Sequence, residues 1–293
     1  MKNLKVEKCG IPEPFINDEF ELFQKGIYDD PQINVFINKE RDFAFLNPLP
    51  ELDYLYYLTR VSKLKLCNYK KKLGIFEERF NRLKHLFTHN INSLVEIGAG
   101  EGSFLSVVKR YNKDIKLTAV EIAEDSTSKR KRIDGLRNYC SVDELVNLGE
   151  KFDMVCMFHV MEHIINPYNF LLLVRKLIHQ DTLIIVEVPS LFDPLLSLYN
   201  CESYRKYFFQ VQHPYNYSNT AIVRLMEWYG FVTKQVISYQ KYGLENHLNW
   251  LVNNSPGGNE QFREIFNDTN RYYRAELESF GRTDTVFWIG MSR

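Results

Sequence analysis

The sequence predicts a doubly wound α/β protein whose central sheet is mostly parallel. Between about residue 90 and residue 240, short apolar strands alternate with helical segments. Strands that are apolar on both faces are typical of a parallel sheet covered by helices. The first of these strands runs directly into a glycine-rich turn and then into a helix, a connection that builds ligand sites in this class of fold.

The expected elements follow one another in a regular order. The strands are predicted at 93–98, 117–121, 136–140, 152–160, 182–189 and 231–239, and the helices at 103–111, 142–149, 166–180 and 218–230. Pro167 suits an early helical position and Pro189 ends a strand. Ser218 is a candidate N-cap for the last of these helices, and Gly230 ends it.

The chain divides into three zones by composition. Residues 1–67 hold several prolines and short β-prone pieces at 33–37 and 43–46, which predicts a small β-rich extension. Residues 68–240 form the core, which opens with an amphipathic helix across 73–87. Residues 241–293 are expected to form a helical insertion followed by a final strand at 284–292.

The composition narrows the possible partners and location. The 293 residues include 37 Lys and Arg and 37 Asp and Glu, so the formal net charge is zero. A protein that binds nucleic acid by electrostatics carries a basic excess, so we expect no nucleic-acid partner. No signal-peptide core and no long apolar run is present, which predicts a cytoplasmic protein without a membrane span. The sequence does not define the oligomeric state.

The cysteines do not predict a metal framework or disulfides. Cys9, Cys67, Cys140, Cys156 and Cys201 form no CxxC pair and are odd in number. Cys140 and Cys156 lie in apolar runs, so we expect both thiols to be buried.

A glycine-rich turn carries the first chemical pattern. The segment VEIGAGEGSF places Gly98, Gly100 and Gly102 between a strand and a helix, with Glu96 just before them. Glu121 ends the next strand, where a carboxylate can accept hydrogen bonds from a ribose diol. A nicotinamide-dependent oxidoreductase would share this architecture, but its GxGxxG pattern needs glycine where Ser103 stands.

The spacing GxGxG with Glu96 and Glu121 resembles motif I of class I S-adenosylmethionine-dependent methyltransferases. The segment FDMVCMFHVMEHIINPYNFL (152–171) is similar to the fourth-strand region of the branch that contains ubiquinone O-methyltransferases and many sugar and natural-product methyltransferases. The resemblance covers roughly 90–240. It implies a seven-stranded Rossmann-like sheet with a reversed last strand, and S-adenosylmethionine as cofactor with S-adenosylhomocysteine as product.

The resemblance also implies the residues that hold this cofactor. Gly98, Gly100 and Gly102 would line its methionine end, and Glu96 would hold the amino group or the loop. Glu121 would bind the ribose hydroxyls.

Further cofactor contacts are implied on the following strands. Ile122 would pack on the adenine, and Phe158 and His159 would flank the reactive end. Asp143 would either bind the adenine amino group or cap the next helix.

The candidate catalytic residues are His159, His163 and His213, because histidine is the usual base when a hydroxyl is methylated. His159, Glu162 and His163 would share one face if the chain turns helical after its strand. With His213 they form a candidate metal set, similar to that of small-RNA 2′-O-methyltransferases, although a histidine in place of the first glutamate disfavours a hard cation such as Mg²⁺. Two alternatives remain open: Glu162 and His163 orient the turn and hold the substrate loop, or a histidine acts as a base without metal.

The candidate substrate-binding residues are Tyr215, Asn246, His247 and Trp250, with core packing as the alternative for each. Their polar and aromatic character suits a small-molecule acceptor such as a sugar or sugar nucleotide of polysaccharide biosynthesis. Arg282 and Asp284, just before the final strand, are weaker candidates. Alternative functions are a metal-assisted RNA 2′-O-methyltransferase, a nicotinamide-dependent oxidoreductase and a non-catalytic cofactor-binding module.

Overall fold

The computed structural model describes residues 10–51, 69–88, 90–123 and 127–293. The chain forms two compact units, one of Met1–Pro50, Met161–Pro167 and Glu187–Ile289, and one of Glu51–Val160, Tyr168–Val186 and Gly290–Arg293. We call them unit 1 and unit 2. The predicted boundary at 67 and the residues Cys9 and Cys67 lie outside the described ranges. Within those ranges, no helix is long and apolar enough to cross a membrane.

A seven-stranded, mostly parallel sheet confirms the predicted fold class. Its order is β10-β11-β8-β7-β4-β5-β6. The strands are β4 Ser93–Ile97, β5 Lys116–Val120, β6 Arg137–Tyr139, β7 Phe152–Phe158, β8 Ile178–Pro189, β10 Phe231–Tyr239 and β11 Thr285–Ser292. β4 pairs in parallel with β5 and with β7, and β5 pairs in parallel with β6. The expected final strand, β11, joins the sheet between β10 and β8.

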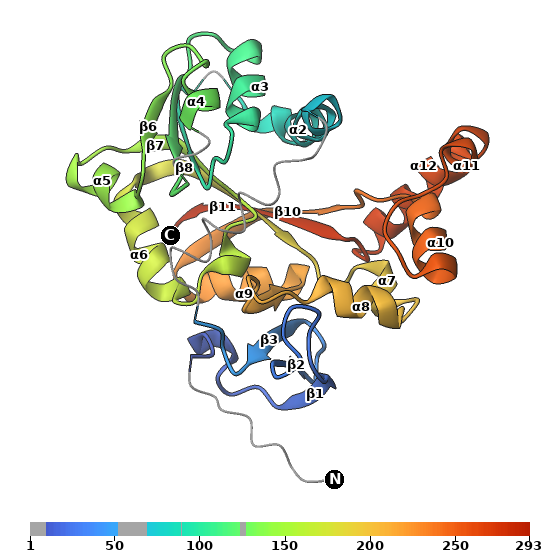
Figure 1. Cartoon of the computed structure of the whole chain (residues 1–293). Helices are drawn as coiled ribbons and strands as arrows, with labels where there is room; N and C mark the ends of the chain where they lie inside the picture. The colour runs from blue at the N-terminus through green and yellow to red at the C-terminus, as the bar shows by residue number, and fades with distance from the viewer. Residues whose placement is uncertain (1–9, 52–68, 89, 124–126) are drawn as a thin grey trace. The chain divides into compact units, whose positions relative to one another are not determined.

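The strands of unit 2 are buried as the apolar pattern predicts. Met154, Val155, Cys156 and Met157 on β7 are fully buried. The helices of unit 2 are α2 Tyr69–Leu83, α3 Ser103–Tyr111, α4 Thr127–Arg130, α5 Val142–Asn147 and α6 Pro167–Lys176, the last beginning at the edge of unit 1. α2 lies beside α3 (Figure 1). Helix coverage keeps water from the parallel strands, as this type of sheet requires.

Two expectations about unit 2 are wrong. Cys140 is exposed because it directly follows β6, which is the edge strand of the sheet. The helix predicted at 166–180 ends at Lys176, and β8 begins at Ile178. The Thr182 hydroxyl accepts a hydrogen bond from the His179 amide at 2.9 Å and donates one to the Phe152 carbonyl at 2.6 Å. These bonds hold the segment beside β7 and extend the strand.

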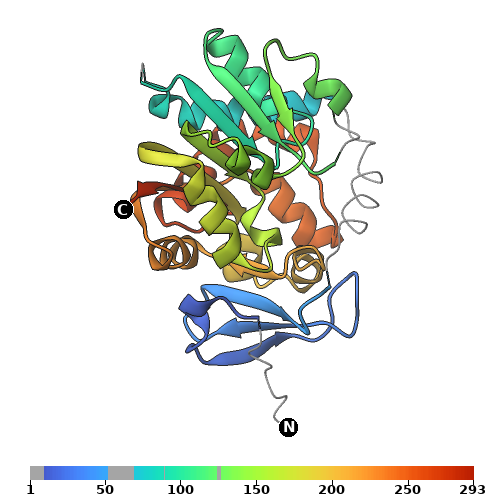
Figure 2. The ribbon, with the colours of Figure 1, turned by 90° about the vertical axis from the view of Figure 1, so that its left-hand side faces the viewer.

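The N-terminal strands of unit 1 belong to a second, antiparallel sheet of order β1-β2-β3-β9. Its strands are β1 Phe20–Gln24, β2 Asn34–Asn38, β3 Phe43–Asn47 and β9 Tyr215–Tyr217, and Figure 2 shows the first three side by side in blue. Phe15 stacks on Phe43 with ring centroids 3.9 Å apart. The sequence predicted β2 and β3, but β1 and β9 were not predicted.

The remaining helices of unit 1 are α7 Pro194–Ser197, α8 Glu202–Phe208, α9 Asn219–Trp228, α10 Leu244–Asn253, α11 Glu260–Ile265 and α12 Asn267–Ser279. α10 to α12 form the helical insertion expected between β10 and β11 (Figure 1). Ser218 is the N-cap of α9, as predicted, and its hydroxyl accepts a hydrogen bond from the Ala221 amide at 3.1 Å.

Replacing Ser218 tests how much this cap stabilises the fold. The change Ser218→Ala leaves the Ala221 amide without its side-chain acceptor, so we expect the free energy of unfolding to fall by about 1 kcal/mol. Urea denaturation measures it. Ser279→Ala, at an exposed position on α12, is the control and should change stability by less than about 0.5 kcal/mol. Equal stability of the two variants would show that the cap does not stabilise α9.

Candidate functional site

The glycine turn after β4 has the conformation that the sequence suggests. Gly98, Gly100 and Gly102 all have positive φ values, of 77°, 52° and 75°. A Cβ atom on Gly98 would lie 2.6 Å from Val160, whereas a Cβ atom on Gly100 would meet no atom within 4 Å. The turn is therefore packed closely at Gly98 and open at Gly100.

The Glu121 carboxylate joins this turn to the end of β5. One oxygen accepts a hydrogen bond from the Gly100 amide at 2.7 Å, and the other accepts one from the Ala123 amide at 2.9 Å. Each carboxylate oxygen has capacity for more than one donor. Glu121 can therefore keep these bonds and still accept bonds from ribose hydroxyls.

Arg130 on α4 is a residue that the sequence did not identify. Its side chain is buried, and its guanidinium donates hydrogen bonds to the Gly100 carbonyl and to the Asn138 side chain. Burial lowers the pKa of Arg130, and the opposing charge of Glu121 partly restores it. Glu121 therefore holds the amide of Gly100, and Arg130 holds its carbonyl. A lone arginine in a lysine- and arginine-rich segment gave no pattern that could reveal this role.

The other predicted cofactor residues lie in different environments. Ile122, next to Glu121, is 48% exposed, which leaves an apolar surface available. Glu96 is buried on β4. Asp143 is exposed in the first turn of α5, and Ser141 rather than Asp143 is the N-cap of that helix.

Phe158 ends β7 within an aromatic cluster. Its ring lies edge-on to Phe104 with centroids 4.7 Å apart, and the Arg79 guanidinium lies 4.6 Å from its centroid. His159 follows with a φ of 55°, a left-handed conformation that is uncommon for a residue with a side chain. Backbone strain of this kind is frequent at functional sites.

A second group of site residues gathers in unit 1. The chain turns after β7 into the short helix η4 Met161–His163, and Glu162, His163 and His213 bring one ligand atom each within 4.8 Å of one another. The His163 and His213 rings meet edge-on with centroids 4.8 Å apart. Among the described residues, this group is a possible cation site. The predicted cluster therefore forms around three of its four members; His159 is not part of it.

The protonation of His163 is set by its neighbour. Its Nδ1 lies 2.7 Å from the Gln212 carbonyl oxygen, which can only accept, so Nδ1 carries the proton. In the neutral ring, Nε2 then carries the lone pair and can take up a proton or bind a cation. The same bond holds the segment before His213, as one of the predicted alternatives describes.

Tyr217 on β9 also belongs to this neighbourhood. Burial raises the pKa of its hydroxyl, and the charges of Tyr215, Tyr229 and Glu162 raise it further. Within the described part of the chain, this buried hydroxyl has no hydrogen-bond partner.

The predicted substrate-binding residues are all buried in unit 1. Tyr215 is fully buried, and its hydroxyl donates to backbone carbonyls. Asn246 donates to the Gly257 carbonyl at 2.9 Å, and Trp250 packs against Tyr204. His247 lies 2.6 Å from the Tyr273 hydroxyl, and burial lowers its pKa to about 4. These contacts give each residue a packing role; substrate binding by them remains a prediction.

Asp193 and Asp284 are two buried carboxylates of unit 1. Asp193 accepts hydrogen bonds from the Leu195 amide at 2.7 Å and the Tyr204 hydroxyl at 2.6 Å. Burial raises the pKa of Asp193 to about 7, and the charge of Asp284 contributes to this shift. Asp284 accepts a bond from the Gln240 side chain at 2.8 Å.

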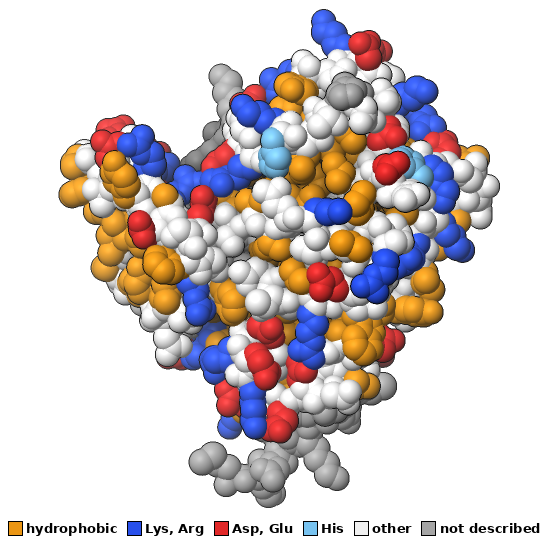
Figure 3. Space-filling view, turned by 180° about the vertical axis from the view of Figure 1, so that it is seen from behind, with side chains coloured by type: hydrophobic (Ala, Val, Ile, Leu, Met, Phe, Trp, Pro, Cys, Tyr) orange, Lys and Arg blue, Asp and Glu red, His pale blue; other side chains and the backbone are white. Residues whose placement is uncertain are grey.

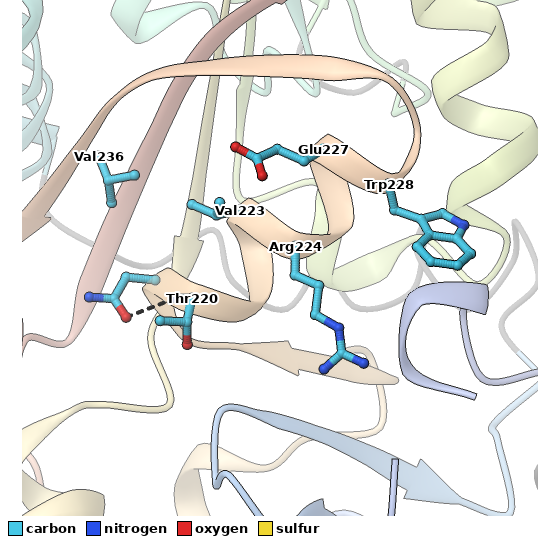
Figure 4. Close-up of a pocket in the computed structure, with 7 residues that line it drawn as sticks. Thr220, Val223, Arg224, Glu227, Trp228 and Val236 are labelled. Atoms are coloured by element: carbon cyan, nitrogen blue, oxygen red, sulfur yellow. Dashed lines mark hydrogen bonds between the residues drawn. The ribbon is translucent and has the colours of Figure 1, made fainter. Parts of the chain in front are cut away.

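An open hollow of about 540 Å³ lies along α9 and β10 in unit 1 (Figure 4). Val223, Val236 and Trp228 contribute apolar surface, and Trp228 is 61% exposed. Two of its polar groups already have partners: Arg224 binds Asp18 at 2.5 Å, and the Thr220 hydroxyl binds Asp42 at 2.9 Å. The hollow therefore offers few groups that could orient a reacting molecule.

Comparison with known proteins decides between the families that share this architecture. The methyltransferase-domain family matches residues 63–236, which is more than half of the chain. The chain belongs to the class I S-adenosylmethionine-dependent methyltransferases. This confirms the family predicted from the glycine turn and the FHVMEH segment, while the branch within this methyltransferase family remains a prediction. No curated protein sequence matches the chain.

Several solved methyltransferase structures are similar to this chain. A SAM-dependent methyltransferase from Archaeoglobus fulgidus is similar with a TM-score of 0.52 and 17% identity, over 81% of this chain and 100% of that one. A chain in the complex of the Haloferax volcanii Trm112 methyltransferase activator with a methyltransferase has a TM-score of 0.50 and 12% identity, over 76% of this chain and 94% of that one. The plantazolicin methyltransferase BpumL, crystallised with S-adenosylhomocysteine, has a TM-score of 0.48 and 12% identity, over 82% and 96%.

The raised pKa of Asp193 predicts a pH dependence of stability. Because its pKa of about 7 in the folded methyltransferase exceeds the ordinary 3.8, the stabilisation from its proton is full below about pH 4 and is lost as pH rises through 7. Asp193→Asn should therefore be less sensitive to pH than the parent protein between pH 5 and 8. Urea denaturation across this range measures the difference.

His247 acts in the opposite direction, because its lowered pKa destabilises the folded protein as pH falls from about 6.5 to 4. Both proteins contain His247, so the difference between their pH profiles excludes it and reports Asp193 together with Asp284, whose charge contributes to the shift. Parallel profiles for the two proteins would show that Asp193 is ionised throughout this range.

Proposed function

We propose that this methyltransferase transfers a methyl group from S-adenosylmethionine to a polar small molecule, with a hydroxyl of a sugar or sugar nucleotide as the predicted acceptor. The cofactor assignment rests on the turn at Gly100. No atom lies within 4 Å of the position that a Gly100 Cβ atom would take, and the Gly100 amide donates a hydrogen bond to the Glu121 carboxylate at 2.7 Å. S-adenosylhomocysteine would be the product.

The residues present fit this cofactor. The open space at Gly100 admits a ligand close to the backbone, which a side chain there would fill. The Glu121 carboxylate has acceptor capacity for two ribose hydroxyls, and the exposed Ile122 offers an apolar surface for an adenine. When bound, the cofactor supplies an electrophilic methyl group, so the protein has only to align the acceptor and remove its proton.

The proposed base is a histidine of the His163 and His213 pair. The Gln212 carbonyl keeps the proton of His163 on Nδ1 and so presents the Nε2 lone pair. Glu162, within 4.8 Å, can stabilise the imidazolium that forms when a proton is taken up. We further propose that Phe158 and His159 flank the reactive end of the cofactor and that Asp143 binds the adenine amino group.

The acceptor assignment rests on charge as well as on resemblance. The chain carries no net charge, and on the face shown in Figure 3 basic and acidic side chains are interspersed. A nucleic-acid substrate favours a continuous basic surface. A small molecule is therefore favoured over RNA, and a cytoplasmic location is the matching expectation.

Filling the glycine turn tests the cofactor site. Gly100→Arg places a side chain in the open space and should weaken binding of S-adenosylhomocysteine by at least about 100-fold, because the ligand and the side chain compete for one volume. Isothermal titration calorimetry measures the affinity.

Gly149→Arg is the matched control. Gly149 also has a positive φ, of 69°, and open space at its Cβ position, so the backbone cost is similar. This control should bind S-adenosylhomocysteine like the parent protein. Tight binding by Gly100→Arg would place the cofactor elsewhere.

The histidine pair yields a second test of function. His213→Ala and His163→Ala should each lower kcat about 10²- to 10⁴-fold on an acceptor identified by product analysis, without a matching loss of S-adenosylhomocysteine affinity. His85→Ala, on η2 Lys84–Leu86, is the control and should retain activity. Full activity in both site variants would remove this pair from the mechanism.

The cluster geometry favours one alternative function, a cation-assisted methyltransferase. If a cation acts here, EDTA abolishes turnover and Mn²⁺ restores it, and Mn²⁺ binding followed by electron paramagnetic resonance weakens about 10- to 100-fold in His213→Ala. Turnover unaffected by EDTA assigns the pair to base catalysis alone.

A further inference from the structure

A separate cavity of about 390 Å³ in unit 1 has the size of a small-molecule site. Its walls come from β1, from β2 and the turn that follows it, from the segment that follows β8, and from Arg282 before β11. Ligands of open α/β sheets bind beyond the carboxyl ends of strands, and Leu191 and Phe192 lie just beyond the end of β8. The cavity is therefore placed where this type of fold receives ligands.

The wall of the cavity combines apolar and polar groups. Phe23, Ile37, Leu191, Phe192 and Leu196 contribute apolar surface, and Arg282 and Asn200 are among the polar groups. Such a wall suits a molecule with an apolar body and a small number of polar groups, because the apolar surface gives affinity and the polar groups fix the orientation.

Arg282 is the cation of this cavity that lacks a carboxylate partner. Its guanidinium lies 4.6 Å from the Phe192 ring centroid, and within the described residues no carboxylate lies in salt-bridge range of it. Of the other charged residues at the wall, Arg41 binds Glu21 at 2.8 Å, and Glu40 makes no ion pair among the described residues. The Arg282 guanidinium is therefore held against an aromatic ring and keeps its hydrogen-bond donors for a ligand.

The backbone of Arg282 is fixed by the end of α12. Gly281 has a φ of 64°, and its amide donates to the Glu278 carbonyl at 3.2 Å. The Arg282 amide donates to the Leu277 carbonyl at 2.9 Å. This pair of bonds is a Schellman motif, which stops the helix and directs the chain into β11. The guanidinium therefore extends from a rigid position, and ordering it around a ligand costs less entropy.

A second donor and local strain mark the same cavity. The Asn200 side-chain oxygen accepts from Arg205 at 3.3 Å, while its amide nitrogen has no acceptor among the described residues. Of the four non-glycine residues with positive φ in the described chain, Arg41 and Asn200 both line this cavity. Residues in sparsely populated backbone conformations are frequent at ligand sites.

We propose that this cavity binds a small molecule with an apolar body through its carboxylate or phosphate, with Arg282 as the anchor and Asn200 as a second donor. The planar guanidinium donates two parallel hydrogen bonds to either anion. The identification of this molecule as the methyl acceptor rests on the proposed function. Its binding in the cavity is independent of that function.

The test uses three probes of similar shape and different charge: benzoate, phenyl phosphate and the neutral benzamide. Their affinities for the full chain are measured by ligand-observed NMR titration, with and without S-adenosylhomocysteine. The variants are Arg282→Gln and Arg282→Lys, and the matched control is Arg271→Gln on α12, whose side chain is 70% exposed. Thermal unfolding of each variant confirms that it is folded.

At least one anionic probe should bind the parent protein and Arg271→Gln about 10-fold or more tightly than benzamide. Arg282→Gln should lose this preference, and Arg282→Lys should keep part of it because it retains the charge without the planar fork. Preference for benzoate assigns a carboxylate, and preference for phenyl phosphate assigns a phosphate.

Equal binding of benzamide and both anions, or an unchanged preference in Arg282→Gln, would overturn the proposal. The cofactor titration separates this result from the proposed function. A parent protein that binds the anionic probes but not S-adenosylhomocysteine would contradict the methyl-transfer proposal and leave the anion site standing.

Discussion

The hydrogen bond from the Gly100 amide to the Glu121 carboxylate is the interaction on which the proposed cofactor site depends. It joins the turn after β4 to the end of β5, two neighbouring parallel strands. Arg130 holds the carbonyl of the same glycine. With both peptide groups of the turn fixed by buried or partly buried side chains, the open space at Gly100 has a defined shape before any ligand arrives.

One hydrogen bond also organises the pair formed by His163 and His213. One backbone carbonyl, that of Gln212, fixes the tautomer of His163 and also ties η4 to the segment that carries His213. The two histidine rings meet beside this bond, and Glu162 precedes His163 in η4. Proton transfer and cation binding use the same Nε2 lone pair, so one geometry supports both chemical alternatives and experiments with cations must decide between them.

Local patterns in the sequence predicted most of the seven-stranded sheet and the glycine turn. β10 lies at the predicted 231–239 and α3 at the predicted 103–111, because apolar periodicity and glycine positions act within a few residues. β9 was missed, since three residues after a proline carry no periodic pattern and their strand partner is the distant β3. The burial of Cys140 was predicted wrongly, because a sequence does not show that the neighbouring strand lies at a sheet edge.

The residues of the candidate site also fall into two groups, those that a local sequence pattern predicts and those that only the fold brings together. Gly100, Glu121 and His163 were identifiable because their spacing from strand ends is a local feature. Arg130 was not, because its contacts with Gly100 and Asn138 depend on the fold of a segment between strands. The cavity at Arg282 combines wall segments that are more than 200 residues apart in the chain. No local pattern could have assembled it.

The most direct test of the central claim is calorimetry of S-adenosylhomocysteine with the parent protein and with Glu121→Ala. The claim predicts a saturable heat with one site in the parent protein and an affinity at least about 10-fold weaker in the variant, because loss of a charged acceptor removes bonds to the ribose and the tether of the turn. The absence of any binding heat in the parent protein, or equal affinity in Glu121→Ala, would contradict it.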